Sequence, residues 1–329
     1  MRVRTKRLVF VLYVVVLTFL AGEIVVRVMY ARFGNYNMEM WRYASELKQP
    51  LPYENLPFCH HPNRHSHCYG VDLATNSLGL RDNEYSVRKD VGNKRIVVIG
   101  DSFTLGWGVE LDQTFCKRLE RMFRRESDEY EVINMGVGNY NSVMEVELFK
   151  QKGLQLEPDL VILMFFLNDT EAVPRGRSRL ADAFIRHSYF YAFLFERHLR
   201  LKSRFLEESG WRSYYSSLYS RKNQENIEAA STAIRDLISL CRRNDIEILV
   251  ANIPELRNLE DYEFGVATDY ICGLAEEGGV PFVDLLPSLT AHKPESLWVS
   301  REDPHANGRA NEIIARRLYE EIADGGMLR

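Results

Sequence analysis

The sequence has no strong excess of charge of either sign, and this absence removes one class of partner. The 42 Lys and Arg residues face 46 Asp and Glu residues, which leaves a formal net charge of −4 over 329 residues. A chain without a global basic field is a poor candidate for nucleic-acid binding. Its composition also lacks the bias of disordered or fibrous chains, because 46% of its residues are hydrophobic. We therefore expect a globular protein that acts on a small molecule or glycan and binds no nucleic acid.

Two phosphate-binding signatures are also missing. The chain has neither the G-x-G-x-x-G pattern of dinucleotide-binding turns nor a Walker A pattern. Glycine-containing turns do follow predicted strands, and such turns can cradle phosphates. A nucleotide- or flavin-binding module is therefore a minor alternative, and we expect no cofactor.

Cysteine is scarce, and only two of the five cysteines form a local pattern. Cys59 and Cys68 bracket a short segment that contains half of the eight histidines. This spacing matches no compact zinc motif, so we expect no metal ion. A local disulfide between the two is the favoured interpretation in an exported chain, with a metal site or two thiols as alternatives. The remaining cysteines are expected to be small core residues; they are Cys116, Cys241 and Cys272.

One long hydrophobic run is present, and it lies at the N-terminus. Four basic residues precede an apolar run over residues 8–21, and residues 24–30 continue it. This order is typical of a membrane segment whose positive end stays in the cytoplasm. The uncharged part is shorter than the roughly 20 residues of a full span, so Glu23 and Arg27 are expected near the far interface.

Residues 1–33 are expected to be a retained membrane anchor, with a cleaved signal peptide as the alternative. The reason is that Phe19 or Leu20 stands where a cleavage site needs a small residue. Either way, the rest of the chain is expected on the periplasmic or extracellular side of the membrane.

The remaining chain divides into an irregular segment and an α/β region. Residues 34–92 are rich in Pro, Asn, His and Tyr, lack sustained periodicity, and are expected to pack on the following domain. Residues 93–329 are expected to be the catalytic domain. Residues 171–224 interrupt it as an insertion rich in Arg and aromatic residues. We expect a helical insertion that packs on the core. The functional alternatives are a lid, a glycan-binding face or a membrane-surface helix.

Apolar runs alternate with amphipathic stretches through the α/β region. Strands are expected at 95–100, 131–134, 159–167, 246–251 and 280–284, and helices at 114–125, 142–153, 226–243, 261–277 and 307–323. This alternation predicts a three-layer α/β/α domain of the flavodoxin-like type, with a parallel sheet of about five strands. The N-terminal membrane helix is additional to it.

Polar residues follow the apolar segments at four places. Chemistry collects at the carboxyl ends of the strands in such a sheet, so these residues are the ones to consider. The four places are Gly100-Asp101-Ser102, residues 134–139, Asn168-Asp169 and Asp303-Pro304-His305. Together they offer the nucleophile, base, acid and oxyanion donors that acyl transfer requires. Asp101 and Asp169 are expected to be structural.

Four blocks around these places resemble, in the same order, those of the GDSL family of the SGNH hydrolase superfamily. They are residues 100–103, 134–141, 166–169 and 303–305, and the resemblance covers roughly residues 70 to 325. Residues 75–81 also resemble a segment that precedes the first block in membrane-anchored bacterial members. The resemblance implies that Ser102 attacks an ester carbonyl while His305 takes its proton. Asp303 then orients the imidazole; it is preferred to Glu302, which stands where many relatives place the acid.

The resemblance also implies an oxyanion hole. Its donors are the backbone N–H of Ser102, the side-chain amide of Asn168 and one backbone N–H of the second block. Gly136, Gly138 and Asn139 are the three alternatives for the last donor. Asn139 stands where many relatives have glycine, and asparagine tolerates positive φ better than most residues.

These expectations point to a serine-dependent ester hydrolase that works through an acyl-enzyme. The expected substrate is an acylated carbohydrate or lipid-like molecule outside the cytoplasm. One alternative is an O-acyltransferase, such as an O-acetyltransferase, acting on a cell-envelope or secreted polysaccharide. The other is a non-catalytic envelope scaffold.

Overall fold

The structure, a computed structural model, describes residues 2–32, 36–174, 187–206 and 210–328. These residues form two compact units. We call Met1–Leu47 with Gly176–Glu208 the N-terminal unit, and Lys48–Arg175 with Ser209–Arg329 the sheet unit. Residues 175–186 and 207–209 of the expected insertion lie outside the described residues.

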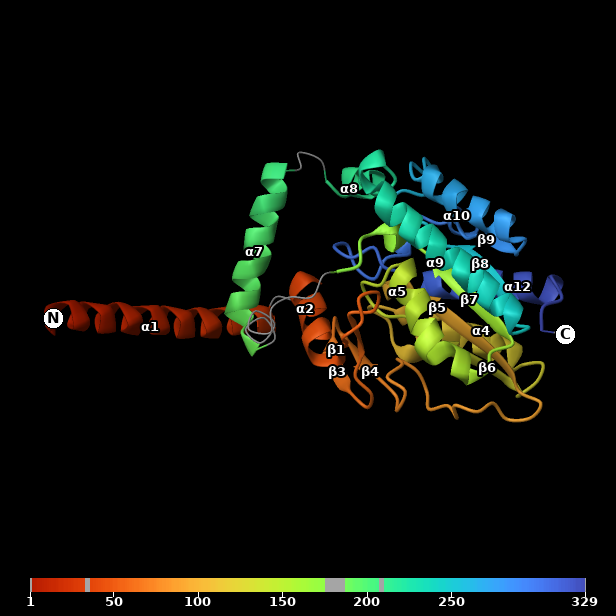
Figure 1. Cartoon of the computed structure of the whole chain (residues 1–329), viewed down its shortest axis with the longest axis horizontal. Coiled ribbons are helices and arrows are strands. Elements are labelled where there is room, and N and C mark those ends of the chain that lie inside the picture. The colour runs from red at the N-terminus through yellow and green to blue at the C-terminus, as the bar shows by residue number, and fades with distance from the viewer. Residues whose placement is uncertain (1, 33–35, 175–186, 207–209, 329) are drawn as a thin grey trace. The chain divides into compact units, whose positions relative to one another are not determined.

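The sheet unit is built on five parallel strands in the order β6-β5-β7-β8-β9 (Figure 1). The strands are β5 (Lys94–Gly100), β6 (Tyr130–Asn134), β7 (Leu160–Phe165), β8 (Glu247–Asn252) and β9 (Phe282–Asp284). Each lies within two residues of its expected bounds, so the prediction of a parallel five-stranded sheet is confirmed. β7 ends earlier than expected because Leu167–Thr170 forms a 3-10 turn.

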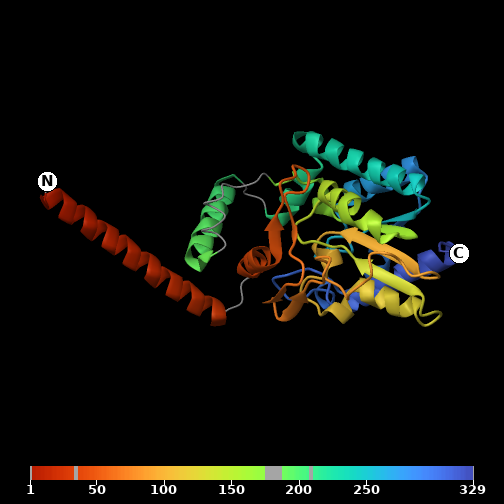
Figure 2. The ribbon, with the colours of Figure 1, turned by 60° about the horizontal axis from the view of Figure 1, so that its bottom comes forward.

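Helices cover both faces of this sheet (Figures 1 and 2). They include α4 (Phe115–Phe123), α11 (Leu286–Leu289) and α12 (Gly308–Asp324) on one face, and α5 (Ser142–Leu148), α9 (Gln224–Arg243) and α10 (Gly265–Gly278) on the other. Successive strand side chains point to opposite faces, so Ile96 and Val98 pack with α4 while Val97 and Ile99 pack with α5. All six residues of β7 are buried. This arrangement confirms the three-layer α/β/α class.

The expected irregular segment, residues 34–92, is more regular than its composition predicts. It begins with α2 (Tyr36–Leu47) in the N-terminal unit and continues in the sheet unit with two antiparallel strand pairs. The strands are β1 (Lys48–Pro50), β2 (Phe58–His60), β3 (His65–Cys68) and β4 (Val71–Ala74). Strands of three or four residues are too short to produce a periodic hydrophobic pattern, which explains why the sequence did not reveal them.

The structure does not contain the disulfide expected between Cys59 and Cys68. Cys59 lies in β2 and Cys68 in β3, and these strands belong to different sheets. Both side chains are buried thiols with separate contacts. The Cys59 Sγ lies 3.3 Å from the carbonyl oxygen of His60, and the Cys68 Sγ lies 3.0 Å from Ser66 Oγ. Cys116 and Cys241 are core residues as expected, whereas Cys272 is partly exposed.

The N-terminal unit contains the long helix α1 (Arg2–Arg32), α2 and α7 (Tyr189–Leu206). Thr5–Tyr30 is long and apolar enough to cross a membrane, and most of its large apolar side chains are exposed. A signal sequence has the same properties, so this helix is either an anchor or a signal segment. Within the expected insertion, the structure describes the helices α7 and α8 (Trp211–Leu218).

The C-terminal third of α1 contacts the start of α7. Three groups donate to the Glu23 carboxylate: the Ser188 hydroxyl at 2.9 Å and the backbone N–H groups of Tyr189 and Phe190 at 3.1 and 2.9 Å. A Cβ atom on Gly22 would lie 2.7 Å from the Phe190 ring, so a glycine is needed there. Glu23 thus satisfies backbone donors that the first turn of any helix leaves open.

Candidate active site

Ser102 begins a short helix, α3 (Ser102–Leu105), directly after β5. The turn between them needs a glycine, because a Cβ atom on Gly100 would lie 2.1 Å from Thr104 Oγ1. Asp101 caps α3, since its Oδ1 accepts from the Phe103 N–H at 2.8 Å. The sequence Gly-Asp-Ser therefore turns the chain sharply and sets the serine at the carboxyl end of the strand.

The structure brings the three predicted catalytic side chains into one hydrogen-bonded chain. Ser102 Oγ lies 2.8 Å from His305 Nε2, and His305 Nδ1 lies 2.5 Å from Asp303 Oδ1. Donation from Nδ1 to the carboxylate leaves Nε2 to accept the serine hydroxyl proton. Asp303 is fully buried, whereas Glu302 is exposed to solvent. Of the two acids, only Asp303 is hydrogen-bonded to His305 within the described part of the chain.

The electrostatics of Asp303 suit a carboxylate that stays ionised. Burial alone would raise the pKa of Asp303, but the charge and hydrogen bonds of His305 and the indole N–H of Trp107 lower it, and the net pKa falls below its usual value. The Trp107 Nε1–H donates to the second carboxylate oxygen, Oδ2, at 2.8 Å. Both oxygens of Asp303 are thereby satisfied.

The second block does not offer its three backbone donors equally. The N–H of Gly136 donates to Asn134 Oδ1 at 2.8 Å and is already used. Asn139 adopts the left-handed conformation with φ 64°, as its place in the family pattern led us to expect. Within the described residues, its N–H donates no hydrogen bond. Gly136 is therefore excluded as the third oxyanion donor, because its N–H is already bonded. The unbonded N–H of Asn139 is the favoured donor, and Gly138 is a buried neighbour of that residue.

Asn168 lies in the turn that follows β7, near Asp101. Its amide hydrogen-bonds the Asp101 carboxyl, and its Oδ1 has no partner among the described residues. Burial raises the pKa of Asp101, and bonds from Phe103 and Asn168 oppose that rise. A side-chain amide has two N–H donors, so one remains for a second acceptor.

Beneath the serine lies a cluster of buried carboxyl groups that the sequence revealed only in part. Asp101, Asp169 and Glu145 are all buried. Burial, reinforced by the neighbouring carboxyl groups, raises the pKa of Glu145 and of Asp169 well above the usual values. Asp169 also accepts weakly from Ser142 Oγ at 3.3 Å. Glu145 was missed because a single Glu within an amphipathic helix usually faces solvent.

Arg81 gives segment 75–81, which precedes the first block, a structural role at the site. Its buried guanidinium donates to the carbonyl oxygens of Leu105, Gly106 and Val109 at 2.9, 2.6 and 2.6 Å. These carbonyls belong to the turn that carries Trp107. The segment thus fixes the indole that holds Asp303, a link that no local pattern could have revealed.

Replacing Trp107 with Phe is expected to lower kcat/KM about 10-fold at neutral pH, because a hydrogen bond to a charged group contributes roughly 1.5 kcal/mol or more. The indole N–H stabilises the ionised form of Asp303, so its loss raises the pKa of that carboxyl. Activity should then be lost at a higher pH on acidification than in the natural chain. A pH profile of kcat/KM checks this, and an unmoved acidic limb would contradict it.

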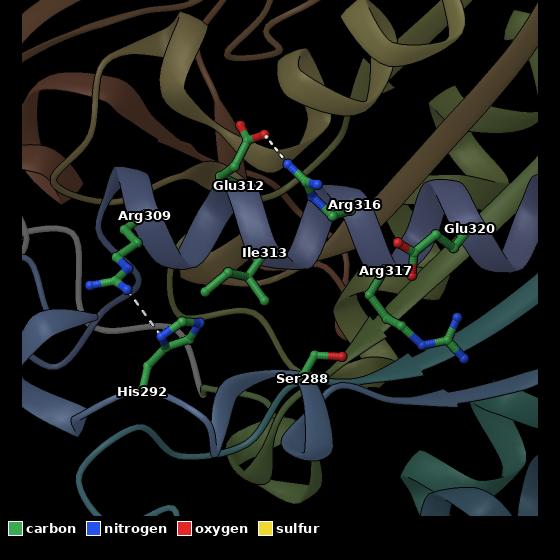
Figure 3. Close-up of a pocket in the computed structure, with 8 residues that line it drawn as sticks. All are labelled: Ser288, His292, Arg309, Glu312, Ile313, Arg316, Arg317 and Glu320. Atoms are coloured by element: carbon green, nitrogen blue, oxygen red, sulfur yellow. Dashed lines mark hydrogen bonds and ion pairs between the residues drawn. The ribbon is translucent and has the colours of Figure 1, made fainter.

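The cavity in Figure 3 lies away from these groups, between α11 and α12. It has a volume of about 440 Å³ and carries mixed charge, with Arg309 Nη2 3.1 Å from His292 Nδ1 and Arg316 Nη2 3.6 Å from Glu312 Oε1. None of its lining residues was predicted as a site residue.

A three-layer α/β domain that joins a hydroxyl, an imidazole and a carboxylate at the ends of its strands is typical of serine-dependent hydrolases. Residues 98–313, more than half of the chain, match the GDSL-like Lipase/Acylhydrolase family. The chain belongs to this family. No curated protein matches the sequence.

Several solved structures are similar to this chain at low sequence identity. An acetylxylan esterase from Geobacillus stearothermophilus is 16% identical, with a TM-score of 0.47 over 70% of this chain and 95% of that one. The structure of TesA is 12% identical, with a TM-score of 0.48 over 70% of this chain and 99% of that one. These likenesses concern the fold alone.

Proposed function

We propose that this protein is a serine-dependent ester hydrolase that works through an acyl-enzyme. The observation that carries the proposal is the continuous chain from Ser102 Oγ through the His305 ring to Asp303, with contacts of 2.8 and 2.5 Å. Distances of this size place a nucleophile and its base within hydrogen-bond reach. A non-catalytic scaffold would have no need to keep this geometry.

In the proposed mechanism, Ser102 Oγ attacks the ester carbonyl as His305 Nε2 removes its proton. The Asp303 carboxylate stabilises the imidazolium that forms. The oxyanion binds to the backbone N–H groups of Ser102 and Asn139 and to the free amide hydrogen of Asn168, each donor contributing about 100- to 1000-fold in kcat. His305 returns the proton to the leaving alcohol, and a water molecule then attacks the acyl-enzyme by the same route.

The proposed location is the outer side of a membrane, with α1 as a single-pass anchor. The basic residues before the apolar run and the exposed apolar side chains of α1 support this orientation. The proposed substrate is an acylated carbohydrate or lipid-like molecule, since neither class needs a basic binding field.

The test is a panel of p-nitrophenyl esters and acetylated polysaccharides, assayed with the full chain and with Ser102→Ala. We expect release of the free acid by the natural chain, and an acyl-Ser102 adduct by mass spectrometry. A gain of acetyl groups on a polysaccharide in the presence of an acyl donor would instead identify an O-acyltransferase. Equal turnover by both chains would refute the proposal.

A further inference from the structure

Lys48, the first residue of β1, has its side chain buried against the second block. Its Nζ donates to the carbonyl oxygen of Gly138 at 2.5 Å and to Asn139 Oδ1 at 3.1 Å. The ammonium group also lies 4.3 Å from the centre of the Phe58 ring. Phe58 is held in turn by Tyr140, whose hydroxyl donates to the Phe58 carbonyl at 2.5 Å. We call Lys48, Phe58 and Tyr140 the Lys48 clamp.

Burial of an ammonium group costs solvation free energy, so the buried position of Lys48 requires a compensating role. Desolvation lowers the pKa of Lys48 to about 7, which measures how strongly the site disfavours the charge. A methionine of similar length would fill this space without that cost. What the lysine adds is an N–H donor to the peptide oxygen between Gly138 and Asn139 and a second donor to the Asn139 side chain.

That peptide has the geometry to transmit the contact. A trans peptide bond is planar, and its C=O and N–H point in opposite directions. Fixing the Gly138 oxygen on Lys48 therefore also fixes the direction of the Asn139 N–H, which belongs to the same plane. A donor on the carbonyl oxygen polarises the peptide and strengthens its N–H as a donor.

The clamp also supports an unfavourable backbone conformation. The left-handed region is unfavourable for an L residue, although less so for Asn than for most. Asn139 lies there with φ 64°. The bond from Lys48 to Asn139 Oδ1 holds the side chain of that residue and thereby offsets part of the cost.

We propose that Lys48 is a positioning residue that orients the Asn139 N–H toward the oxyanion. The inference rests on the proposed hydrolase function and deepens it: Lys48 touches no reacting atom and acts through the Gly138–Asn139 peptide. It therefore affects the transition state, where the oxyanion exists, more than substrate binding.

The test compares Lys48→Met with Lys94→Met in the full chain. Lys94 also donates to a backbone carbonyl, that of Leu328, but lies at the start of β5, and is the matched control. We expect Lys48→Met to lower kcat about 10- to 100-fold with KM within about twofold, less than complete loss of an oxyanion donor costs. The control should keep kcat within about twofold, as expected for a lysine outside the second block. Unchanged kcat in a folded Lys48→Met chain would overturn the inference.

A double variant makes the test specific. Glycine enters the left-handed region without strain, so Lys48→Met with Asn139→Gly should recover part of the lost kcat. If Lys48→Met does not fold, Lys48→Gln replaces it, because it removes the charge and keeps one donor group. No recovery in the double variant would contradict the role assigned to Asn139.

Amide NMR separates this inference from the proposed function. The Asn139 amide nitrogen resonance should move in Lys48→Met, because the donor on the Gly138 oxygen polarises that peptide, and should stay in place in the control variant, whether or not any ester is hydrolysed. Absence of Ser102-dependent turnover in the natural chain would refute the hydrolase alone. An unmoved Asn139 resonance in Lys48→Met would refute the clamp alone.

Discussion

Ser102→Ala is expected to reduce kcat toward p-nitrophenyl acetate by on the order of 10⁴- to 10⁶-fold. The Ser102 hydroxyl oxygen lies 2.8 Å from His305 Nε2. The substitution to alanine removes this nucleophile and little else. Hydrolysis kinetics measure the loss, and a fluorophosphonate probe should label the natural chain and leave the variant unlabelled.

The matched control for this substitution is Ser217→Ala, because Ser217 is an exposed serine of α8. Its kcat should equal that of the natural chain, and both variants should unfold at similar temperatures. Residual turnover of Ser102→Ala within about 10-fold of the natural rate would mean that another group is the nucleophile, because loss of a true nucleophile costs far more.

The second large effect is expected at the acid of the triad, where two neighbouring carboxylates can be compared directly. Asp303→Asn should lower kcat by about 10³- to 10⁴-fold, because an amide cannot accept the His305 Nδ1–H and stabilise the imidazolium in the same way. Glu302→Gln should leave kcat within about twofold, since Glu302 is exposed. The same p-nitrophenyl assay measures both variants.

This pair also separates catalysis from stability. Asp303 is buried and its pKa in the folded protein lies below the usual value. Its ionised form therefore stabilises the fold at pH values above the pKa of the unfolded chain. This stability is lost as the pH falls through the pKa of the folded protein. Asp303→Asn should therefore lose less stability on acidification than the natural chain. A strong kcat loss in Glu302→Gln with a mild one in Asp303→Asn would reverse the assignment.

The sequence predicted the parts of the molecule whose signals are local. The apolar runs marked all five strands of the sheet. Polar residues at strand ends marked Ser102 and Asn168, and a short motif before the last helix marked His305. The parallel sheet and its burial between two helical layers follow from the same alternation of strands and helices. Short motifs at the ends of regular elements are therefore readable without coordinates.

The remaining features depend on contacts between distant parts of the chain. Trp107 reaches Asp303 across 196 positions, and Lys48 reaches Gly138 across 90. No periodicity connects such residues. The choice between Gly136 and Asn139 likewise required knowing that the Gly136 N–H is already bonded. The mistaken disulfide has a similar cause, because proximity in sequence concealed that Cys59 and Cys68 lie in different sheets.

The contact between Glu23 and α7 has a consequence for the maturation of the protein. Proteolysis that released residues 1–23 would remove the acceptor for three donors at the start of α7, and losing a helix cap typically costs about 1 kcal/mol. The Phe190 ring would also lose its neighbour Phe19, whose ring centre lies 5.4 Å away. A shed form would thus differ from the membrane-bound form in its folded part as well as in its length.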